Sequence, residues 1–252
     1  MYTVKRLFIF LCSATLTAFA SKEPSTSGAL TPFFDETTRL YGFKDLHGKV
    51  VMAPQFEHVG HQHGPSFAAD HPQTAFLTPV WKFGQWWQMD RQGQLKFSSI
   101  FYDNGADYYV SGLTRFLDRK EEKVGFHNTK GEIVIAAKFD YASPFEKIFF
   151  GKEEDSKQYD GQYAIVALGC WLEKPAVGYK YRPMSSNSGH CLINPSDGCR
   201  LMAESQLCGG RWGAIDRNGT VIIPLEHDGY EAVRLLLMDL EKKEYEEAHQ
   251  PV

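Results

Sequence analysis

The side chains best suited to metal chemistry are four closely spaced histidines: His58, His61, His63 and His71. Neutral imidazoles at such short spacing could hold Zn²⁺ or Cu²⁺. The surrounding segment is rich in Gly and Pro, and it has no Cys or acid at an obvious ligand spacing. Such a composition is typical of a polar surface loop. These histidines are therefore the metal candidate, but we expect a loop that binds neither a metal nor another cofactor.

Three tryptophans form the second group that could contact a ligand: Trp81, Trp86 and Trp87. Their rings surround a predicted hairpin turn and could stack on a sugar or on a peptidoglycan fragment. Aromatic residues also dominate the cores of β proteins. We therefore expect core anchors, with a ligand-facing role as the alternative.

No familiar catalytic motif occurs in the sequence. Gly-x-Ser-x-Gly, His-Glu-x-x-His, Ser-x-x-Lys and phosphate-binding glycine loops are all missing. We assign no catalytic and no cofactor-binding residue, and we expect a protein that is not an enzyme.

The chain repeats a strand–turn–strand unit four times, and this unit positions these residues. Counted from Gly42, Trp87, Gly125 and Gly213, an Asp or Asn follows three residues later and a Gly six residues later. The Asp or Asn side chain can accept backbone N–H groups two residues on, and the Gly permits the positive φ that closes a short hairpin. The predicted turn residues are Asp45 and Gly48, Asp90 and Gly93, Asn128 and Gly131, and Asp216 and Gly219.

This pattern resembles the WG repeat, written Trp/Tyr-Gly-aromatic-x-Asp-x-x-Gly followed by apolar residues and Pro. The last copy is the closest match, with Trp212-Gly213 and Pro224. The first copy (Tyr41-Gly42) and the third (Val124-Gly125) are near it, whereas the second has Trp87 in place of Gly. The resemblance implies a β-repeat interaction module, and it supplies no active site.

Residues 170–208 interrupt the last copy and are interpreted as an inserted Cys-rich loop. Cys170 leaves one predicted strand and Cys208 enters the next, while Cys191 and Cys199 flank a turn-rich tip. Four cysteines permit three connectivities. Placement at the neck and at the tip favours disulfides Cys170–Cys208 and Cys191–Cys199.

The two ends of the chain differ from the repeats. Residues 1–20 are basic, then apolar, and end in Ala18-Phe-Ala20, as in a cleaved signal peptide, and residues 21–29 form a flexible leader. At the other end, Asp228 and Glu231 suggest a capping box ahead of apolar residues at helical spacing, which predicts a capping helix in 229–252.

Charge limits the possible partners. The whole chain has a formal net charge of −4, and loss of Lys5 and Arg6 with the signal peptide would make it more negative. An acidic domain without a basic stripe argues against nucleic acid. We also expect no stable membrane insertion after signal removal.

The predicted fold is mainly β, with residues 30–228 forming an array of four WG-like meander repeats, curved or propeller-like, closed by the C-terminal helix. The predicted function is that of a secreted or periplasmic, non-enzymatic module that binds an envelope protein or glycan. The alternative is a cell-wall-acting hydrolase whose site is formed by the repeat loops.

Overall fold

The computed structural model describes residues 28–60, 66–67, 75–102, 105–149, 160–172, 180–186, 189–194, 198–202 and 207–249. The predicted signal peptide and most of the leader lie outside these residues. For Tyr102 and the strands between 171 and 208, only the backbone is described.

Four antiparallel three-stranded units, here called meanders 1 to 4, make up most of the protein. Their strands are β1 (Thr31–Asp35), β2 (Leu40–Lys44) and β3 (Val50–Phe56); β5 (Leu77–Lys82), β6 (Gln85–Asp90) and β7 (Leu95–Ser99); β10 (Leu113–Asp118), β11 (Lys123–Asn128) and β12 (Ile133–Phe139); and β14 (Tyr163–Leu172), β18 (Leu207–Asp216) and β19 (Val221–His227). The fold is therefore mainly β.

The turn between the second and third strands has the same hydrogen bonds in all four meanders. In meander 4, the Gly219 N–H donates to the Asp216 carbonyl at 2.9 Å, and the Asp216 carboxylate accepts the N–H groups of Asn218 and Thr220. The four turn glycines have φ between 81° and 84°. The structure thus places all eight predicted turn residues in hairpin turns of one geometry: Asp45, Gly48, Asp90, Gly93, Asn128, Gly131, Asp216 and Gly219.

A bulge of the third strand explains the glycine at the second position of the Trp-Gly pair. In meander 4, Ala214 pairs with Ile223 and Trp212 pairs with His227, so Gly213 alone faces three residues of β19. A Cβ on Gly213 would lie 2.5 Å from the carbonyl oxygen of Ile223. Gly42 and Gly125 lie equally close to the backbone of β3 and β12.

Meander 2 lacks this crowding because its strands pair differently. Trp87 pairs directly with Ser98, without a bulge opposite it. A large side chain therefore fits where the other meanders require glycine.

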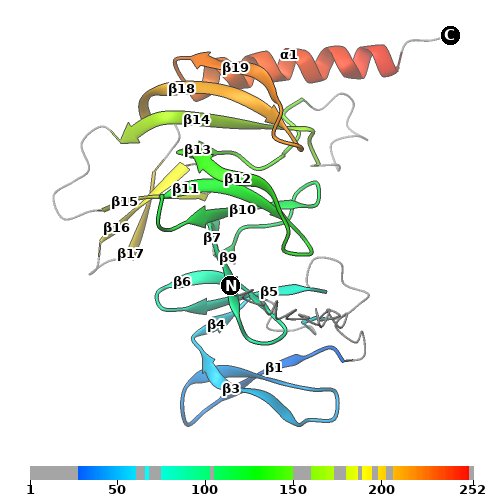
Figure 1. Ribbon diagram of the computed structural model, residues 1–252, viewed down its shortest axis with the longest axis vertical. Coiled ribbons are helices and arrows are strands. Elements are labelled where there is room, and N and C mark those ends of the chain that lie inside the picture. The colour runs from blue at the N-terminus through cyan, green and yellow to red at the C-terminus, as the bar shows by residue number, and fades with distance from the viewer. Residues whose placement is uncertain are drawn as a thin grey trace, which may run out of the picture.

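Each meander is joined to the next by a continuation of its third strand. The short strands β4 (His58–Val59) and β13 (Tyr141–Ala142) pair with β5 and β14, and the end of β7 pairs with β10. Figure 1 shows the meanders following one another along the long axis, with meander 1 and the C-terminal helix at opposite ends. The array is therefore open, not a ring.

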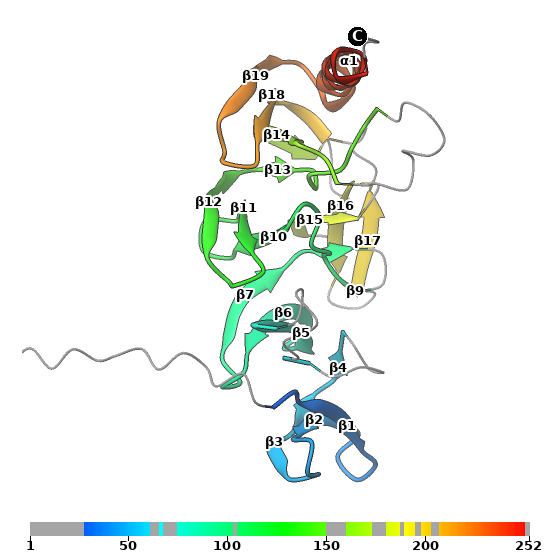
Figure 2. The ribbon, with the colours of Figure 1, turned by 90° about the vertical axis from the view of Figure 1, so that its right-hand side faces the viewer.

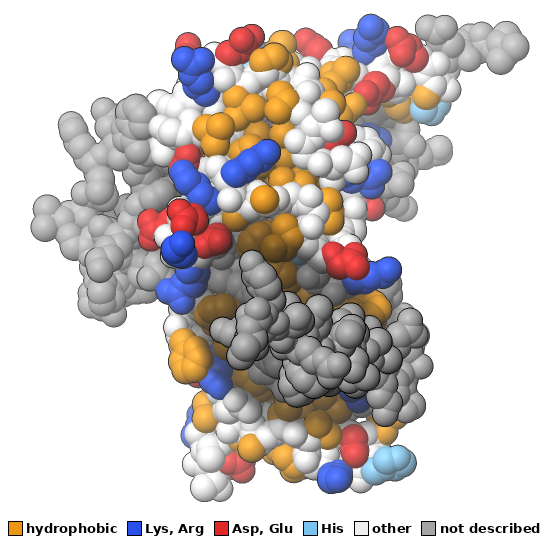
Figure 3. Space-filling view, viewed as in Figure 1, with side chains coloured by type: hydrophobic (Ala, Val, Ile, Leu, Met, Phe, Trp, Pro, Cys, Tyr) orange, Lys and Arg blue, Asp and Glu red, His pale blue; other side chains and the backbone are white. Residues whose placement is uncertain are grey.

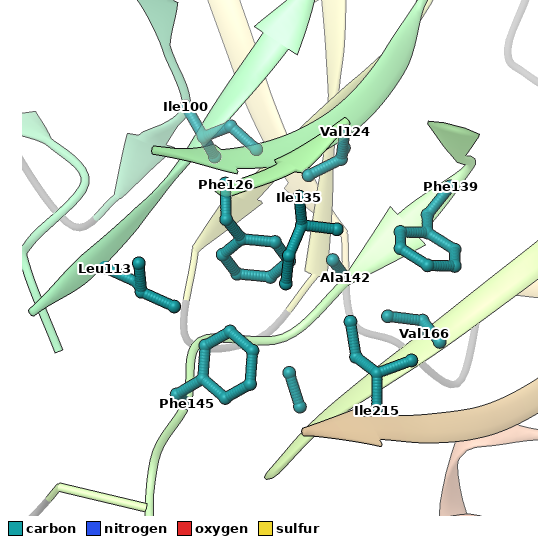
Figure 4. Packing of buried hydrophobic residues seen from close by; sticks show 11 residues of the cluster. Ile100, Leu113, Val124, Phe126, Ile135, Phe139, Ala142, Phe145, Val166 and Ile215 are labelled. Atoms are coloured by element: carbon teal, nitrogen blue, oxygen red, sulfur yellow. The ribbon is translucent and has the colours of Figure 1, made fainter. Parts of the chain in front are cut away.

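The hydrophobic core lies mainly between successive meanders. One cluster joins Phe43 and Met52 of meander 1 to Val80 and Met89 of meander 2. A second joins meanders 3 and 4, and Figure 4 shows Ile135 and Phe139 close to Val166 and Ile215. Burial between neighbours is what stabilises a repeat array.

Helix α1 (Tyr230–Ala248) caps meander 4. Val233 and Leu237 are fully buried in the cluster that contains Trp212, and the Glu241 carboxylate accepts the N–H groups of Ile148 and Phe149. A helix lies within the predicted range 229–252, but the predicted capping box is wrong: the N-cap is Gly229, and no side chain caps it. Among the described helices, none has the length and apolar character needed to span a bilayer.

The insertion in meander 4 contains a sheet where a loop was expected. Strands β15 (Lys180–Ser186), β16 (Gly189–Asn194) and β17 (Gly198–Met202) form an antiparallel sheet beside meander 3, as Figure 2 shows. Another hairpin, β8 (Phe101–Tyr102) and β9 (Gly105–Ala106), connects β7 to meander 3.

The predicted Cys170–Cys208 disulfide is wrong for this structure, in which Cys170 is a buried free thiol. Strands β14 and β18 do meet at the neck, but Cys170 pairs with Gly209, and Cys208 pairs with Trp171. A one-residue offset places the two positions on opposite faces of the sheet, which prevents a bridge. Cys191 and Cys199 lie on the paired strands β16 and β17, two positions out of register, and their side chains are outside the description.

Candidate binding surface

The third strands of meanders 1, 3 and 4 lie at sheet edges. Strands β3, β12 and β19 each pair on one side only, with β2, β11 and β18. In each strand the bulge over the glycine comes in the second half, and a second register shift in the first half makes Val51, Val134 and Ile222 extra residues. No described strand pairs with the outer edge of these first halves.

These three edges present the same apolar residues to solvent. The second and third residues after each turn glycine are aliphatic and between 39% and 57% exposed: Val50, Val51, Ile133, Val134, Val221 and Ile222. We call these six residues the aliphatic stripe. Meander 2 interrupts it, because Lys96 is exposed at the third position after Gly93. Figure 3 shows hydrophobic side chains gathered over β18, β19 and β12.

An exposed apolar edge is unusual because it invites pairing with another chain. Proteins commonly protect edge strands with charges, prolines or bulges. Here Pro54 and Pro224 protect only the second half of β3 and β19, whereas the first halves have a bulge at Val51 and Ile222 but no proline. In these first halves, apolar side chains lie beside backbone groups that no described strand pairs, and edges of this chemistry can accept a protein strand.

The three tryptophans proposed as ligand-facing do not form one exposed platform. Trp86 is buried, and Trp81 and Trp87 are half-buried. The Trp81 indole packs edge-on against Trp86 at 5.6 Å and donates its N–H to Glu57. The Trp87 indole donates to the Lys82 carbonyl. Two of these contacts lie within meander 2, and the bond to Glu57 ties it to the segment that follows β3.

The histidine group is only partly described. His58 is exposed on β4 opposite Trp81, whereas His61, His63 and His71 lie outside the described residues. Within the described ranges, no cluster of three or more His, Cys, Asp or Glu side chains could hold a metal ion.

A shallow pocket of about 360 Å³ lies where the turn of meander 4 meets the start of β10. Its walls include Ser111, Gln162, Asp216 and Arg217. The Asp216 carboxylate already accepts two N–H groups of its own turn, and these bonds, outweighing desolvation, lower its pKa. Asp216 therefore stabilises the turn and is not suited to donating a proton.

A buried ion pair in meander 3 escaped the sequence analysis. The Arg115 guanidinium, 1% exposed, donates to both carboxylate oxygens of Asp107 at 2.6 and 2.7 Å and to the Ala142 carbonyl at 3.1 Å. Burial opposes its charge, but Asp107 outweighs burial and raises the Arg115 pKa. The sequence feature that could have revealed this pair is an arginine inside an apolar strand. Meanders 1 and 2 have Pro32 and Pro79 at the same position.

A second buried titratable group lies on the neighbouring strand. His127 of β11 stacks on Phe97 at 4.2 Å, and burial lowers its pKa to about 4. Its Nδ1 lies 2.9 Å from the Asn128 carbonyl, and its Nε2 has no hydrogen-bond partner in the described structure. A neutral imidazole that packs as an aromatic ring fits a core role.

The fold and these edges define an open array of stacked β-meanders with a repeated, exposed aliphatic edge. The sequence matches a family described as WG containing repeat over residues 125–147 and 212–232. Each match covers the second and third strands of a meander, in meanders 3 and 4, and the segment that follows. The predicted WG repeats are thereby confirmed at these two places. No curated protein matches the chain, and no solved structure matches it.

Proposed function

We propose that this chain is a non-enzymatic module that binds another protein through the aliphatic stripe. The observation that carries the proposal is the recurrence of two exposed aliphatic residues at the same position on three edge strands. A single exposed Val or Ile on a strand needs no explanation, but three matched edges favour a common role.

Protein is a better partner than glycan for this surface. Sugars are bound by aromatic platforms and polar groups, whereas the stripe is aliphatic and has unpaired backbone groups beside it. Segments 58–73 and 170–208 add no support, because most of the first lies outside the described residues and only the backbone of the second is described beyond Cys170. No described observation favours the hydrolase alternative.

We extend the WG assignment to all four meanders. Meanders 1 and 2 share the turn geometry of the two matched units, and meander 1 also shares the bulge over its glycine. Meander 2 is the divergent unit, with Trp87 and Lys96 at the altered positions.

We also propose that the protein is exported, and that a signal peptidase cleaves it after Ala20. N-terminal sequencing of protein from the cell envelope or medium should begin at Ser21. Recovery of membrane-bound protein that still begins at Met1 would contradict this proposal.

Placing lysines in the stripe should abolish partner binding without unfolding the protein. The triple variant Val51→Lys, Val134→Lys, Ile222→Lys puts at three meanders the residue that meander 2 already has as Lys96. In pull-downs from envelope extract, mass spectrometry should show that the variant retains at least about tenfold less of each protein that the parent retains. This is the effect of losing a central apolar contact.

The matched control adds the same charge to exposed leucines outside the stripe: Leu46→Lys, Leu235→Lys, Leu236→Lys. This control should retain the same proteins as the parent. The proposal is wrong if the stripe variant retains them equally, or if the parent retains no protein above background.

A further inference from the structure

The three junctions between meanders share one register. In each junction, two residues of the incoming strand pair with the same two positions in the first strand of the following meander. These pairs are Val59 with Val80 and His58 with Trp81; Ser99 with Phe116 and Ser98 with Leu117; and Ala142 with Val166 and Tyr141 with Ala167. Val80, Phe116 and Val166, the acceptor residues of the first pair in each junction, also pair with the second strand on their other side. Their partners there are Trp87 in meander 2 and the glycine of the Trp-Gly pair in meanders 3 and 4. The register of the glycine therefore defines the site at which a junction strand is accepted.

Strand β1 has this acceptor site, but no described strand occupies it. Phe33 pairs with Gly42, so Phe33 and Phe34 stand at the two acceptor positions. In the described structure, β1 pairs only with β2, and its outer edge is bonded only at Leu30, which exchanges two backbone hydrogen bonds with Ser66. Phe34 is 38% exposed, whereas its equivalent Trp81 is half-buried, and its equivalents Leu117 and Ala167 are buried.

The backbone groups at this edge match those used in the occupied junctions. The Trp81 carbonyl accepts the Glu57 N–H at 3.0 Å, and the Pro79 carbonyl accepts the Gly60 N–H at 2.8 Å. The carbonyls of Ala167 and Ile165 are used in the same way. Their counterparts in β1 are the carbonyls of Phe34 and Pro32. Pro32, like Pro79, has no N–H to donate, but its carbonyl is still able to accept a hydrogen bond from an incoming strand.

The occupied junctions also indicate what kind of strand would fit. Two incoming segments begin with an aromatic residue and an acid, Phe56-Glu57 and Phe139-Asp140. The acid is bound in both: Glu57 accepts the Trp81 indole N–H, and Asp140 accepts the Gly169 N–H and pairs with Lys123.

Meander 1 offers a cation for such an acid. The Arg39 guanidinium lies 5.7 Å from the centre of the Phe34 ring. Its contact with Glu36 is long, at 4.0 Å, and both side chains are largely exposed. The other nearby carboxylate, Asp35, already accepts the Thr38 N–H and hydroxyl. Arg39 can therefore turn towards an incoming acid.

A second copy of this chain does not offer the required strand. In meander 4 the segment after β19 enters α1 at Tyr230, where the other meanders have a junction strand. The helix thus closes one end of the array, while at the other end no described strand covers the outer edge of β1.

We propose that the outer edge of β1 accepts an extended segment of another protein, which adds antiparallel to β1 in the junction register. The segment has an aromatic residue, then Asp or Glu, then a variable residue and a small apolar residue. Main-chain hydrogen bonds hold it, and Arg39 recognises its acid, as in binding by β-strand addition. This site is separate from the aliphatic stripe, so the two proposals fail independently.

The test uses the full-length protein and a fluorescent peptide with the sequence of residues 136–144, measured by fluorescence anisotropy. The peptide should bind saturably. The variant Phe34→Pro, which blocks strand addition at the outer edge, should weaken binding about tenfold or more, the scale of losing main-chain pairing. The triple-lysine stripe variant should bind the peptide as the parent does.

A charge swap keeps the test valid if Phe34→Pro is unstable. A peptide with Asp140→Lys should bind the parent poorly and should recover binding to the variant Arg39→Glu. The absence of saturable binding to the parent would overturn the proposal. Equal binding by a folded Phe34→Pro variant, or a charge swap without recovery, would also overturn it, because the peptide would then be bound elsewhere.

Discussion

Replacing Gly213 by alanine is expected to destabilise the protein by about 3 kcal/mol, the upper end of the usual range for overpacking. The added Cβ would lie 2.5 Å from the Ile223 carbonyl oxygen, 2.8 Å from the Pro224 carbonyl oxygen and 2.9 Å from the Leu225 nitrogen. All three are backbone atoms of the bulge in β19, so no side-chain rotation can relieve the contact. The free energy of unfolding from urea titration measures the effect.

Gly105 provides the control for this substitution. A Cβ at Gly105 would meet no atom within 4 Å, and its φ lies outside the left-handed region. Gly105→Ala should therefore stay within about 0.5 kcal/mol of the parent, as most surface substitutions do. If Gly213→Ala is as stable as Gly105→Ala, the bulge does not explain the glycine of the Trp-Gly pair.

Removing Asp107 is expected to cost about 3–5 kcal/mol, because Asp107→Ala leaves the buried Arg115 charge without its carboxylate. Both side chains are at most 3% exposed, so water cannot replace the lost partner without opening the core. Thermal and urea unfolding of the variant should show this loss. The double variant Asp107→Ala, Arg115→Met should recover much of it, since apolar residues of similar volume often replace a buried pair without cost.

The exposed pair Lys120–Glu121 is the matched control for the ion pair. Its side chains are 88% and 61% exposed. Glu121→Ala should change stability by less than about 1 kcal/mol, as for other surface pairs. If the Asp107→Ala variant unfolds at the same temperature and urea concentration as the parent, the buried pair does not hold the start of meander 3 to β13.

Local signals were sufficient to predict the turns and the helix. Asp216 and Gly219 determine a hairpin through bonds within five residues, so the sequence reveals them directly. The apolar residues Val233 and Leu237 recur at helical spacing and are buried as expected. The capping box failed because Asp228 and Glu231 fit the motif, yet Gly229 is the N-cap, and Glu231 pairs with Arg234.

Features that depend on register or on distant partners were not predictable in this way. The neck of the insertion was located correctly, but whether Cys170 faces Cys208 depends on a single residue of register. The junction strands β4 and β13 have two residues each, too few for a periodic signal. The partner of Arg115 lies in the connection before β10, and no spacing rule links it to Asp107.

The residues of the aliphatic stripe are visible in the sequence, but their environment is not. Val50-Val51, Ile133-Val134 and Val221-Ile222 have the composition of buried strand, yet they are exposed. Only Met52, Ile135 and Ile223, one residue further on, are buried. The difference arises because the third strand of these meanders is an edge, which sheet order determines and composition does not.

The most direct test of binding at the stripe is site-specific photo-crosslinking. A benzoylphenylalanine placed in turn at Val51, Val134 and Ile222 should crosslink the same partner protein in the envelope fraction, detected by mass spectrometry. The same group at Leu235 on α1 should not crosslink that partner. No crosslink from any stripe position, or an equal crosslink from Leu235, would contradict binding at the stripe.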